Sequence, residues 1–275
     1  MNTNLNFIFW GTPDVASETL EILKMNGYVP SLIVTSPDKP QGRKMLMTPP
    51  PAKVWAEANN IPFIQPENLS REGLSFTDNL DLFIVAAYGK IIPEDILNIP
   101  KLGSINVHYS LLPKYRGASP VESAILNGDT VTGVSIQKMV YKMDAGDVIA
   151  SLETNINPAE TAPELRKRLI ALGGELLVKI LPDFTEGKIT PITQNETLAT
   201  NCHKIKKEDG LLDLTAPGEI NYRKYRAYSN WPRVFIFDEN KKRIIITKAK
   251  LEKGEFVIEK FIPEGGKEQD YKTSI

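Results

Sequence analysis

The chain has 275 residues, 41% hydrophobic and 24% charged, which excludes low-complexity disorder and allows one large domain or two smaller ones. One cysteine and two histidines exclude an intramolecular disulfide and a zinc cluster of these residue types, and no metal is expected. Without an apolar run long enough to span a membrane, the chain is expected to be a soluble, reduced, cytoplasmic protein.

The near-zero net charge hides an asymmetry along the chain. Residues 1–200 carry 17 Lys and Arg against 22 Asp and Glu, whereas residues 201–275 carry 16 against 12. A basic C-terminal segment on an acidic body is typical of proteins that contact nucleic acid, although a solvated lysine-rich surface gives the same small excess. Charge alone leaves both interpretations open.

Strand and helix signals alternate over the first 150 residues. An apolar run at 5–10 predicts a strand, and in the turn after it Thr12 can cap a helix whose first turn accommodates Pro13. Further strands are predicted at 31–35, 62–65, 82–87 and 104–108, with helices at 52–59 and 94–98. Because the run 82–87 is apolar on both faces, the predicted fold is Rossmann-like α/β, a mostly parallel sheet with helices on both sides.

The rest of the chain predicts a long helix and a second group of strands. Two alternating stretches, 132–140 and 147–152, precede a helix over 162–181. Strands at 233–238, 243–248 and 255–261 indicate a small β-rich module. The predicted organisation is a first domain over residues 1–184, a connector over 185–205, and a β-rich domain over 206–275.

One strand and one loop carry candidate chemistry. Alternation places Asn106 and His108 on one face at the carboxyl end of the strand 104–108, where ligands of open α/β sheets bind. A structural histidine is an equally good interpretation of these residues alone. For Asp144, in the loop between two strands, an Asx-turn is the favoured interpretation, and a carboxylate that orients the His108 imidazole is the alternative.

A long loop over residues 36–51 separates a predicted strand from a helix. Loops of more than ~12 residues without regular structure are usually functional or disordered. Arg43 and Lys44 give this loop the charge to contact phosphate, and a mobile surface loop is an equal alternative.

Short motifs along nearly the whole chain are shared with a known family. They are Phe9–Asp14, Pro37–Arg43, Val85–Gly89, Ile105–Pro113, Tyr115–Ala118, Met143–Asp147 and Asn230–Pro232. The Asn-x-His, Ser-Leu-Leu-Pro and Asp-x-Gly-Asp patterns among them resemble the folate-dependent formyltransferases. The Gly-Thr-Pro-Asp, Pro-Asp-x-Pro and Asn-Trp-Pro patterns resemble the branch of that family that acts on methionyl-tRNA.

The resemblance implies formyl transfer from 10-formyltetrahydrofolate to the α-amine of methionine on initiator tRNA. It implies that Asn106 and His108 donate hydrogen bonds to the oxyanion, while Asp144 holds His108 and helps the attacking ammonium lose its proton. The folate is expected against Val85, Ala86, Ala87, Tyr88, Gly89, Ser110, Leu111, Leu112 and Pro113. Contacts with the tRNA are expected at Arg43, Lys44, Lys204, Lys206 and Lys207. A monomer without membrane association is expected.

The sequence departs from the family's pattern in three places. Tyr109 stands where the family usually has Gly, and Lys39 stands where Arg is usual. The C-terminal OB-like β-barrel is truncated, because its middle strands are missing after residue 250. Two alternatives therefore stay open: an amino-sugar (sugar-nucleotide) N-formyltransferase that uses the same folate donor, and a non-catalytic tRNA- or folate-binding module.

Overall fold

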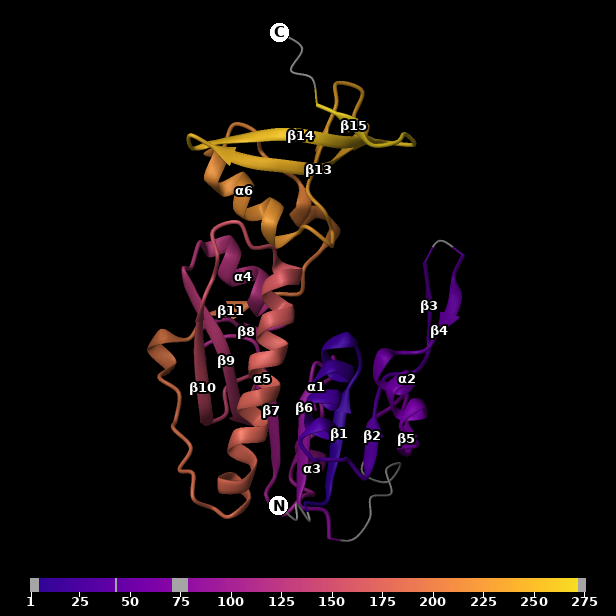
Figure 1. The fold of residues 1–275 in the computed structure, drawn as a ribbon, viewed down its shortest axis with the longest axis vertical. Helices are drawn as coiled ribbons and strands as arrows, with labels where there is room; N and C mark the ends of the chain where they lie inside the picture. The colour runs from indigo at the N-terminus through magenta and orange to yellow at the C-terminus, as the bar shows by residue number, and fades with distance from the viewer. Residues whose placement is uncertain (1–4, 43, 71–78, 272–275) are drawn as a thin grey trace. The chain divides into compact units, whose positions relative to one another are not determined.

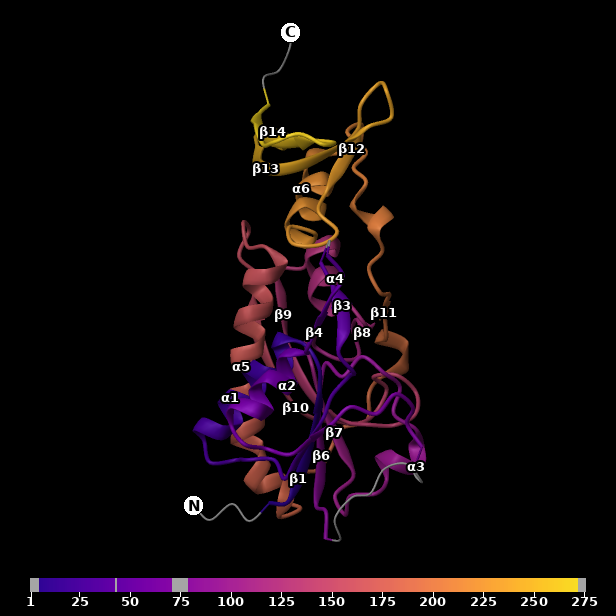
Figure 2. The same ribbon diagram turned by 90° about the vertical axis from the view of Figure 1, so that its right-hand side faces the viewer.

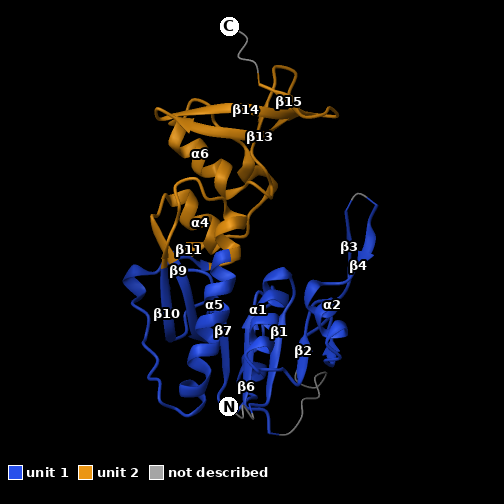
Figure 3. Cartoon of the chain, in the orientation of Figure 1, with its two compact units in different colours: residues 1–116, 133–153, 168–200 blue, residues 117–132, 154–167, 201–275 orange. Residues whose placement is uncertain are grey.

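The computed structural model of the chain describes residues 5–42, 44–70 and 79–271 (Figure 1, Figure 2). The fold divides into two compact units, coloured separately in Figure 3. The first consists of residues 1–116, 133–153 and 168–200, and the second of residues 117–132, 154–167 and 201–275. Two segments from the first 200 residues therefore belong to the same unit as the C-terminal residues.

The first unit is built around a mostly parallel sheet. Its strands in the described residues are β1 (Phe7–Gly11), β2 (Leu32–Val34), β5 (Phe63–Ile64), β6 (Leu82–Ala86), β7 (Ser104–His108), β9 (Val131–Lys138) and β10 (Val148–Asn155). They lie in the order β10-β9-β7-β6-β1-β2-β5. The strands from β7 to β5 in this order are parallel, and β9 runs antiparallel to β7. The predicted mostly parallel sheet is confirmed.

Helices pack on both faces of this sheet. They are α1 (Asp14–Met25), α2 (Pro51–Ala58), α3 (Glu94–Leu97) and α5 (Ala162–Thr185). Two glycines allow close approach on one face: a Cβ on Gly11 would lie 2.5 Å from the Cβ of Ala16 in α1, and a Cβ on Gly173 in α5 would lie 3.0 Å from Val107. Because α1 and α5 cover this face, the odd-numbered residues of β7 are part of the core.

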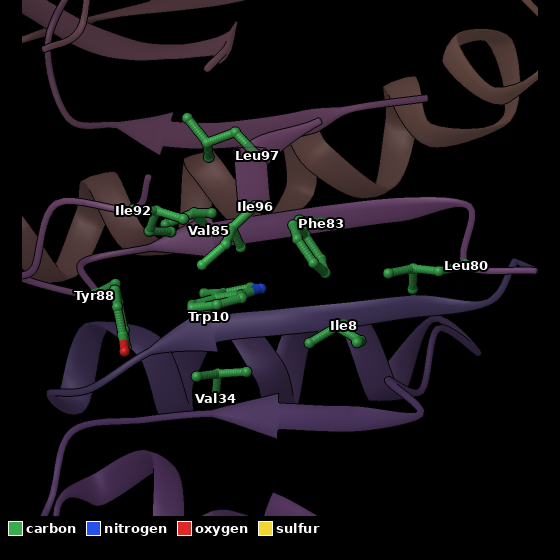
Figure 4. Close-up of a cluster of buried hydrophobic side chains, with 10 residues drawn as sticks. All are labelled: Ile8, Trp10, Val34, Leu80, Phe83, Val85, Tyr88, Ile92, Ile96 and Leu97. Atoms are coloured by element: carbon green, nitrogen blue, oxygen red, sulfur yellow. The ribbon is translucent and has the colours of Figure 1, made fainter. Parts of the chain in front are cut away.

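The opposite face of the sheet carries the apolar cluster drawn in Figure 4. Trp10 of β1 lies edge-on to Phe83 of β6 and to Tyr88, with ring centroids 5.2 Å apart in both pairs. Ile96 of α3 covers the cluster. Trp10 and Val85 are neighbours in register. Helices cover both faces of the sheet at β1 and β6, and the residues of these two strands are therefore apolar on both faces.

The loops after β1, β2 and β6 meet where the strand order reverses. From β1 the chain continues outward through β2 and β5 and then returns to β6 on the other side of β1. The expected Thr12 helix cap is wrong, because Pro13 is the N-cap residue of α1. The Thr12 hydroxyl instead donates to the Tyr88 carbonyl at 3.1 Å and lies 3.1 Å from the Ser36 hydroxyl. Ligands of open α/β sheets bind at such a reversal.

The loop over residues 36–51 was expected to lack regular structure and contains a hairpin instead. Strands β3 (Lys39–Gln41) and β4 (Leu46–Thr48) pair antiparallel within it. Met45, Leu46 and Met47 at its tip are each more than half exposed. Each strand of this hairpin has only three residues, which is too short for an alternation of apolar and polar side chains to predict a strand.

The second unit contains the predicted small β-rich module. Its sheet in the described residues consists of β12 (Phe235–Phe237), β13 (Arg243–Glu252), β14 (Glu255–Pro263) and β15 (Gln269–Asp270), antiparallel in that order. Its helices are α4 (Pro120–Asn127) and α6 (Gly218–Ala227). The remaining short elements along the chain are β8 (Arg116–Gly117), β11 (Asn201–Cys202) and the 3-10 helices η2 (Glu196–Leu198) and η3 (Lys207–Gly210).

Helix α6 joins the small sheet to the other parts of its unit. Tyr225 packs against Phe256 of β14, with ring centroids 6.3 Å apart. The buried Arg226 guanidinium donates to the backbone carbonyls of Asn157 and Glu160 at 3.3 and 3.1 Å. Buried polar groups usually have such partners, so these bonds account for the burial of Arg226 in a helix of mostly polar sequence. None of the helices in the described ranges combines the length and apolar character that crossing a membrane requires.

Candidate active site

Asn106 and His108 lie on one face of β7, near the carboxyl ends of the parallel strands, as the alternation predicts. In register, Asn106 is flanked by Val85 of β6 and Gln137 of β9, and Ser135 of β9 lies opposite His108. This is the face of the sheet that α3 covers. Both candidate residues are therefore held by strands inside a sheet.

The His108 ring is only 5% exposed and lies between two oxygen atoms. Its Nε2 is 2.9 Å from the carbonyl oxygen of Tyr115, and because a carbonyl only accepts, Nε2 carries a proton and donates it. Its Nδ1 is 3.6 Å from Oδ2 of Asp144. The Asp144 carboxylate and the Tyr115 carbonyl thus lie at the two different nitrogens of the ring.

Asp144 lies in the loop between β9 and β10, with a backbone φ of 50°. Asp adopts this left-handed conformation more readily than most residues do. Its Oδ1 accepts a hydrogen bond of 2.7 Å from Nε2 of Gln137. The fold therefore brings Asp144 to His108, which is the arrangement that the sequence alone favoured less than an Asx-turn.

The Asn106 amide is half-buried beside this pair. Within the described ranges its side chain makes no hydrogen bond to protein atoms. An amide held on a strand and left with open donors can stabilise negative charge that develops on a substrate oxygen.

The two segments expected to contact folate lie on either side of Asn106 and His108 along the chain. Val85, Ala86, Ala87, Tyr88 and Gly89 continue β6 into its loop, and Ser110, Leu111, Leu112 and Pro113 follow β7. Ala87 and Gly89 are exposed and have positive φ, whereas the Tyr88 ring is buried in the apolar cluster, where burial raises its pKa to about 12 (Figure 4). The first segment therefore presents small side chains and backbone rather than its aromatic ring.

The second segment is fixed by the neighbouring strand. The hydroxyl of Ser135 donates to the Ser110 carbonyl at 2.8 Å and accepts from the Leu112 amide at 3.0 Å. Leu111, Leu112 and Pro113 remain half-buried. This gives a flat ligand an apolar lining next to His108.

The residues expected to contact tRNA lie in separate parts of the fold. Lys44 is exposed in the β3–β4 hairpin, and Arg43 lies outside the described residues. At the base of the hairpin, Asp38 accepts from Gln65 and Lys53 at 2.7 and 2.8 Å, and these bonds lower the pKa of its carboxyl group. In the second unit, the side chains of Lys204, Lys206 and Lys207 are exposed.

Tyr109 points away from the candidate site. It directly follows His108, the last residue of β7, and its side chain therefore faces α1 and α5 on the opposite side of the sheet. A Cβ on Gly173 of α5 would lie 3.5 Å from its Cε1. Burial raises the pKa of Tyr109, and the acidic groups of Asp14 and Glu18 in α1 act in the same direction. The bulk of Tyr109 thus lies in the core and not on the face of β7 that carries His108.

The sequence patterns did not indicate three polar residues that lie near Asp144 in the structure. Gln137 lies on β9, where its alternation with Ser135 could have indicated it. Arg116 and Gln194 carry no comparable signal, because one lies in a turn-rich motif and the other in the connector without periodicity. All three are buried.

Comparison with known proteins places the chain in a family. Residues 3–181 match the family described as formyl transferase, and residues 204–268 match the formyl transferase C-terminal domain. A methionyl-tRNA formyltransferase from Geobacillus sp. is 43% identical over 232 residues, which cover 83% of this chain and 73% of that protein. A methionyl-tRNA formyltransferase from Thermotoga maritima is 44% identical over 231 residues, covering 83% of this chain and 74% of that protein.

Solved structures share the fold at lower identity. An N-formyltransferase from Helicobacter canadensis, in complex with folinic acid and dTDP-3-aminofucose, has a TM-score of 0.69 at 19% identity and covers 97% of this chain and 100% of its own. A methionyl-tRNA formyltransferase from Clostridium thermocellum has a TM-score of 0.61 at 18% identity and covers 98% of this chain and 99% of its own. The chain therefore belongs to the formyl transferase family, among the methionyl-tRNA formyltransferases.

Proposed function

We propose that this protein transfers the formyl group of 10-formyltetrahydrofolate to the α-amine of methionine esterified to initiator tRNA. One observation carries the proposal: in a chain 43% identical to methionyl-tRNA formyltransferases, His108 Nδ1 lies 3.6 Å from Asp144, on a strand whose same face carries Asn106. The reaction supplies N-formylmethionyl-tRNA to translation initiation.

In the proposed reaction the amine nitrogen attacks the formyl carbon, and the carbonyl oxygen becomes an oxyanion. Asn106 donates a hydrogen bond to that oxyanion. His108 donates a second one through Nδ1 when the ring is protonated, because Nε2 already donates to the Tyr115 carbonyl. The fixed positions of both residues on β7 mean that little reorganisation is needed as charge develops. The bond between the formyl carbon and N10 of the folate then breaks as the carbonyl re-forms. The attacking nitrogen gives up one proton and N10 takes one up, so the transfer step has no net change in protons. The products are the formylated amine and tetrahydrofolate.

Asp144 and His108 are the groups that take part in proton transfer in this scheme. Only the free amine is a nucleophile, so the methionyl ammonium must first lose a proton. Asp144 assists this loss and keeps His108 oriented, while the Tyr115 carbonyl holds the opposite ring nitrogen. These steps use general acid–base groups and hydrogen-bond donors of the chain itself.

The residues of the two folate segments fit a flat heteroaromatic ring. The exposed backbone of Ala87 and Gly89 can pair with the polar edge of a pterin, and half-buried Leu111, Leu112 and Pro113 can lie against its faces. When bound, the folate supplies the formyl group.

For the organisation of the chain, we assign catalysis to residues 1–184 and contact with the acceptor arm to 206–275, with 185–205 as the connector. The exposed Lys206 and Lys207 support this assignment. Lys44, in the hairpin, and Lys204, in the connector, are also exposed and are proposed as further tRNA contacts. Arg43 is assigned the same role on its charge. We further propose that the protein acts as a cytoplasmic monomer.

A substrate test separates the proposal from its two alternatives. Purified protein is incubated with 10-formyltetrahydrofolate and either charged initiator tRNA or a dTDP-linked amino sugar. We expect formylation of the methionyl-tRNA and no formyl sugar. Activity on the sugar alone would identify a sugar-nucleotide N-formyltransferase, and binding of tRNA or folate without turnover of either acceptor would identify a non-catalytic module.

Replacing Lys204, Lys206 and Lys207 together by Gln is expected to weaken tRNA binding and its salt dependence. Each lost phosphate contact reduces the slope of log K against log[salt] by about 0.7 to 0.9, so the slope should become shallower by about 2 to 3. Titrations at several salt concentrations measure this slope.

The matched control replaces three exposed lysines elsewhere, Lys24, Lys101 and Lys188, by Gln. It changes the net charge equally and should leave the slope as in the wild type. Equal slopes for all three proteins would place the phosphate contacts outside the lysines of residues 204–207.

A further inference from the structure

A chain of buried polar side chains leads from the connector to Asp144, within the first unit. Arg116 donates through Nε and Nη2 to Oε1 of Gln194, at 3.0 and 2.8 Å. Nε2 of Gln194 donates to the backbone carbonyls of Asp144 and Gly146, at 2.9 and 2.6 Å. We call Arg116, Gln194 and Gln137 the polar relay.

The arginine fixes the direction of every hydrogen bond in the polar relay. A guanidinium has donors and no acceptor, so the Gln194 oxygen must face Arg116 and its NH2 group must face the Asp144 loop. The same NH2 group lies 3.4 Å from Oε1 of Gln137. Gln137 is thereby oriented with its own NH2 group toward Asp144, where it donates to Oδ1 at 2.7 Å.

The polar relay therefore controls both the backbone and the carboxylate of Asp144. The two bonds from Gln194 hold the loop in which Asp144 has a φ of 50°. The bond from Gln137 occupies Oδ1, and Oδ2 is the oxygen that lies 3.6 Å from Nδ1 of His108. Arg116 and Gln194 are 4% and 8% exposed, so water cannot replace these bonds without rearrangement.

The charge of the buried guanidinium is balanced at its outer end. Arg116 also pairs with Glu196 at 2.7 Å, and Glu196 pairs with Lys142 at 2.8 Å. These two cations lower the pKa of Glu196 to about 2. Glu196 thus touches Arg116 from the same connector as Gln194. In the described residues its bond to the loop between β9 and β10 is to the exposed side chain of Lys142, whereas Gln194 bonds the loop backbone at Asp144 and Gly146.

We infer that Gln194 is a positioning residue for formyl transfer: oriented by Arg116, it holds Asp144 against His108. The inference rests on the proposed function, since it assigns Gln194 a role through the proposed catalytic carboxylate. The connector thereby contributes to the chemistry of the site as well as joining two parts of the chain.

The test replaces Gln194 by Glu, which keeps the size of the side chain and both bonds to Arg116. The change turns a donor into an acceptor that faces the carbonyls of Asp144 and Gly146. We expect kcat to fall about 10- to 100-fold while the KM values for tRNA and folate stay within about three-fold, because misplaced catalytic groups lower the rate rather than binding. The control Glu196→Gln should keep kcat within about two-fold, as for an exposed ion pair.

A double-mutant cycle separates positioning from a general effect on the fold. Asp144→Asn leaves no carboxylate to position, so adding Gln194→Glu to Asp144→Asn should lower kcat no further. Independent, additive losses would overturn the inference, and so would a wild-type kcat in the Gln194→Glu variant. Should Gln194→Glu not fold, Gln194→Met, of similar volume and without the reversed polarity, replaces it throughout the cycle.

A readout without turnover distinguishes failure of the inference from failure of the proposed function. The chain has two histidines, so the ring resonances of His108 and His203 are easily assigned by NMR. Gln194→Glu should shift the His108 resonance and leave that of His203 unchanged, while Glu196→Gln should shift neither. Unshifted His108 in a folded Gln194→Glu variant contradicts the inference even if the acceptor is not tRNA.

Discussion

The variant His108→Ala is expected to lose about 100-fold or more in kcat for formylation of methionyl-tRNA. An oxyanion donor in a site that excludes water contributes on this scale, and the same change removes the group that Asp144 and the Tyr115 carbonyl hold in place. The measurement is single-turnover formylation with saturating folate and charged tRNA.

The other histidine provides the matched control. His203 is exposed in the connector and, among the residues that the structure describes, has no hydrogen bond to the candidate site, so His203→Ala should keep the wild-type rate. Circular dichroism and thermal melting check that His108→Ala folds, since the ring it removes is buried. A folded His108→Ala variant with the wild-type rate would contradict the proposed mechanism.

The variant Gly146→Ala is expected to lose at least about 100-fold in kcat through displacement of the Asp144 loop. A Cβ at this position would lie 1.8 Å from the carbonyl oxygen of Lys138 and 2.8 Å from its carbon, so backbone must shift. Displacement of a catalytic group by about 1 Å costs on this order. Overpacking of this kind also lowers the free energy of unfolding by about 1 to 3 kcal/mol, which chemical denaturation measures.

Gly187→Ala is the control for a glycine whose neighbours leave space. Gly187 has a φ of +70° and no atom within 4 Å of a built Cβ, so its substitution strains the backbone without a clash. It should lower stability by about 1 kcal/mol and leave kcat unchanged. Equal loss of activity in the two variants would show that stability, and not the position of Asp144, accounts for the Gly146→Ala result.

Features of the fold that depend on short runs of residues were predicted correctly from the sequence. The run 82–87 is apolar on both faces, and β6 is buried on both. Alternation alone put Asn106 and His108 on one face of β7, because the side-chain period of a strand is fixed. Comparison with relatives confirmed the family and the activity that the motifs indicated.

What the sequence did not predict depends on contacts between distant residues. Asp144 meets His108 only because β9 pairs with β7, and Gln194 reaches the same loop from a connector without periodicity. Helix α6 was missed because its ten residues are mostly polar, and it buries Asn221 and Arg226 through hydrogen bonds. A hydrophobic pattern cannot indicate elements that are stabilised in this way.

The buried Tyr109 ring, directly after β7, lies against α5 at Gly173, a residue without a side chain. The side chains at 106 and 108 thus face the candidate site, whereas those at 105, 107 and 109 are packed on the other face of the sheet. The space available to the side chain of residue 109 is therefore limited by α5, the helix that it faces. In a redesign, bulk added at 173 would have to be offset at Val107 and Val134, which lie 3.0 and 3.2 Å from a Cβ built there, as well as at Tyr109.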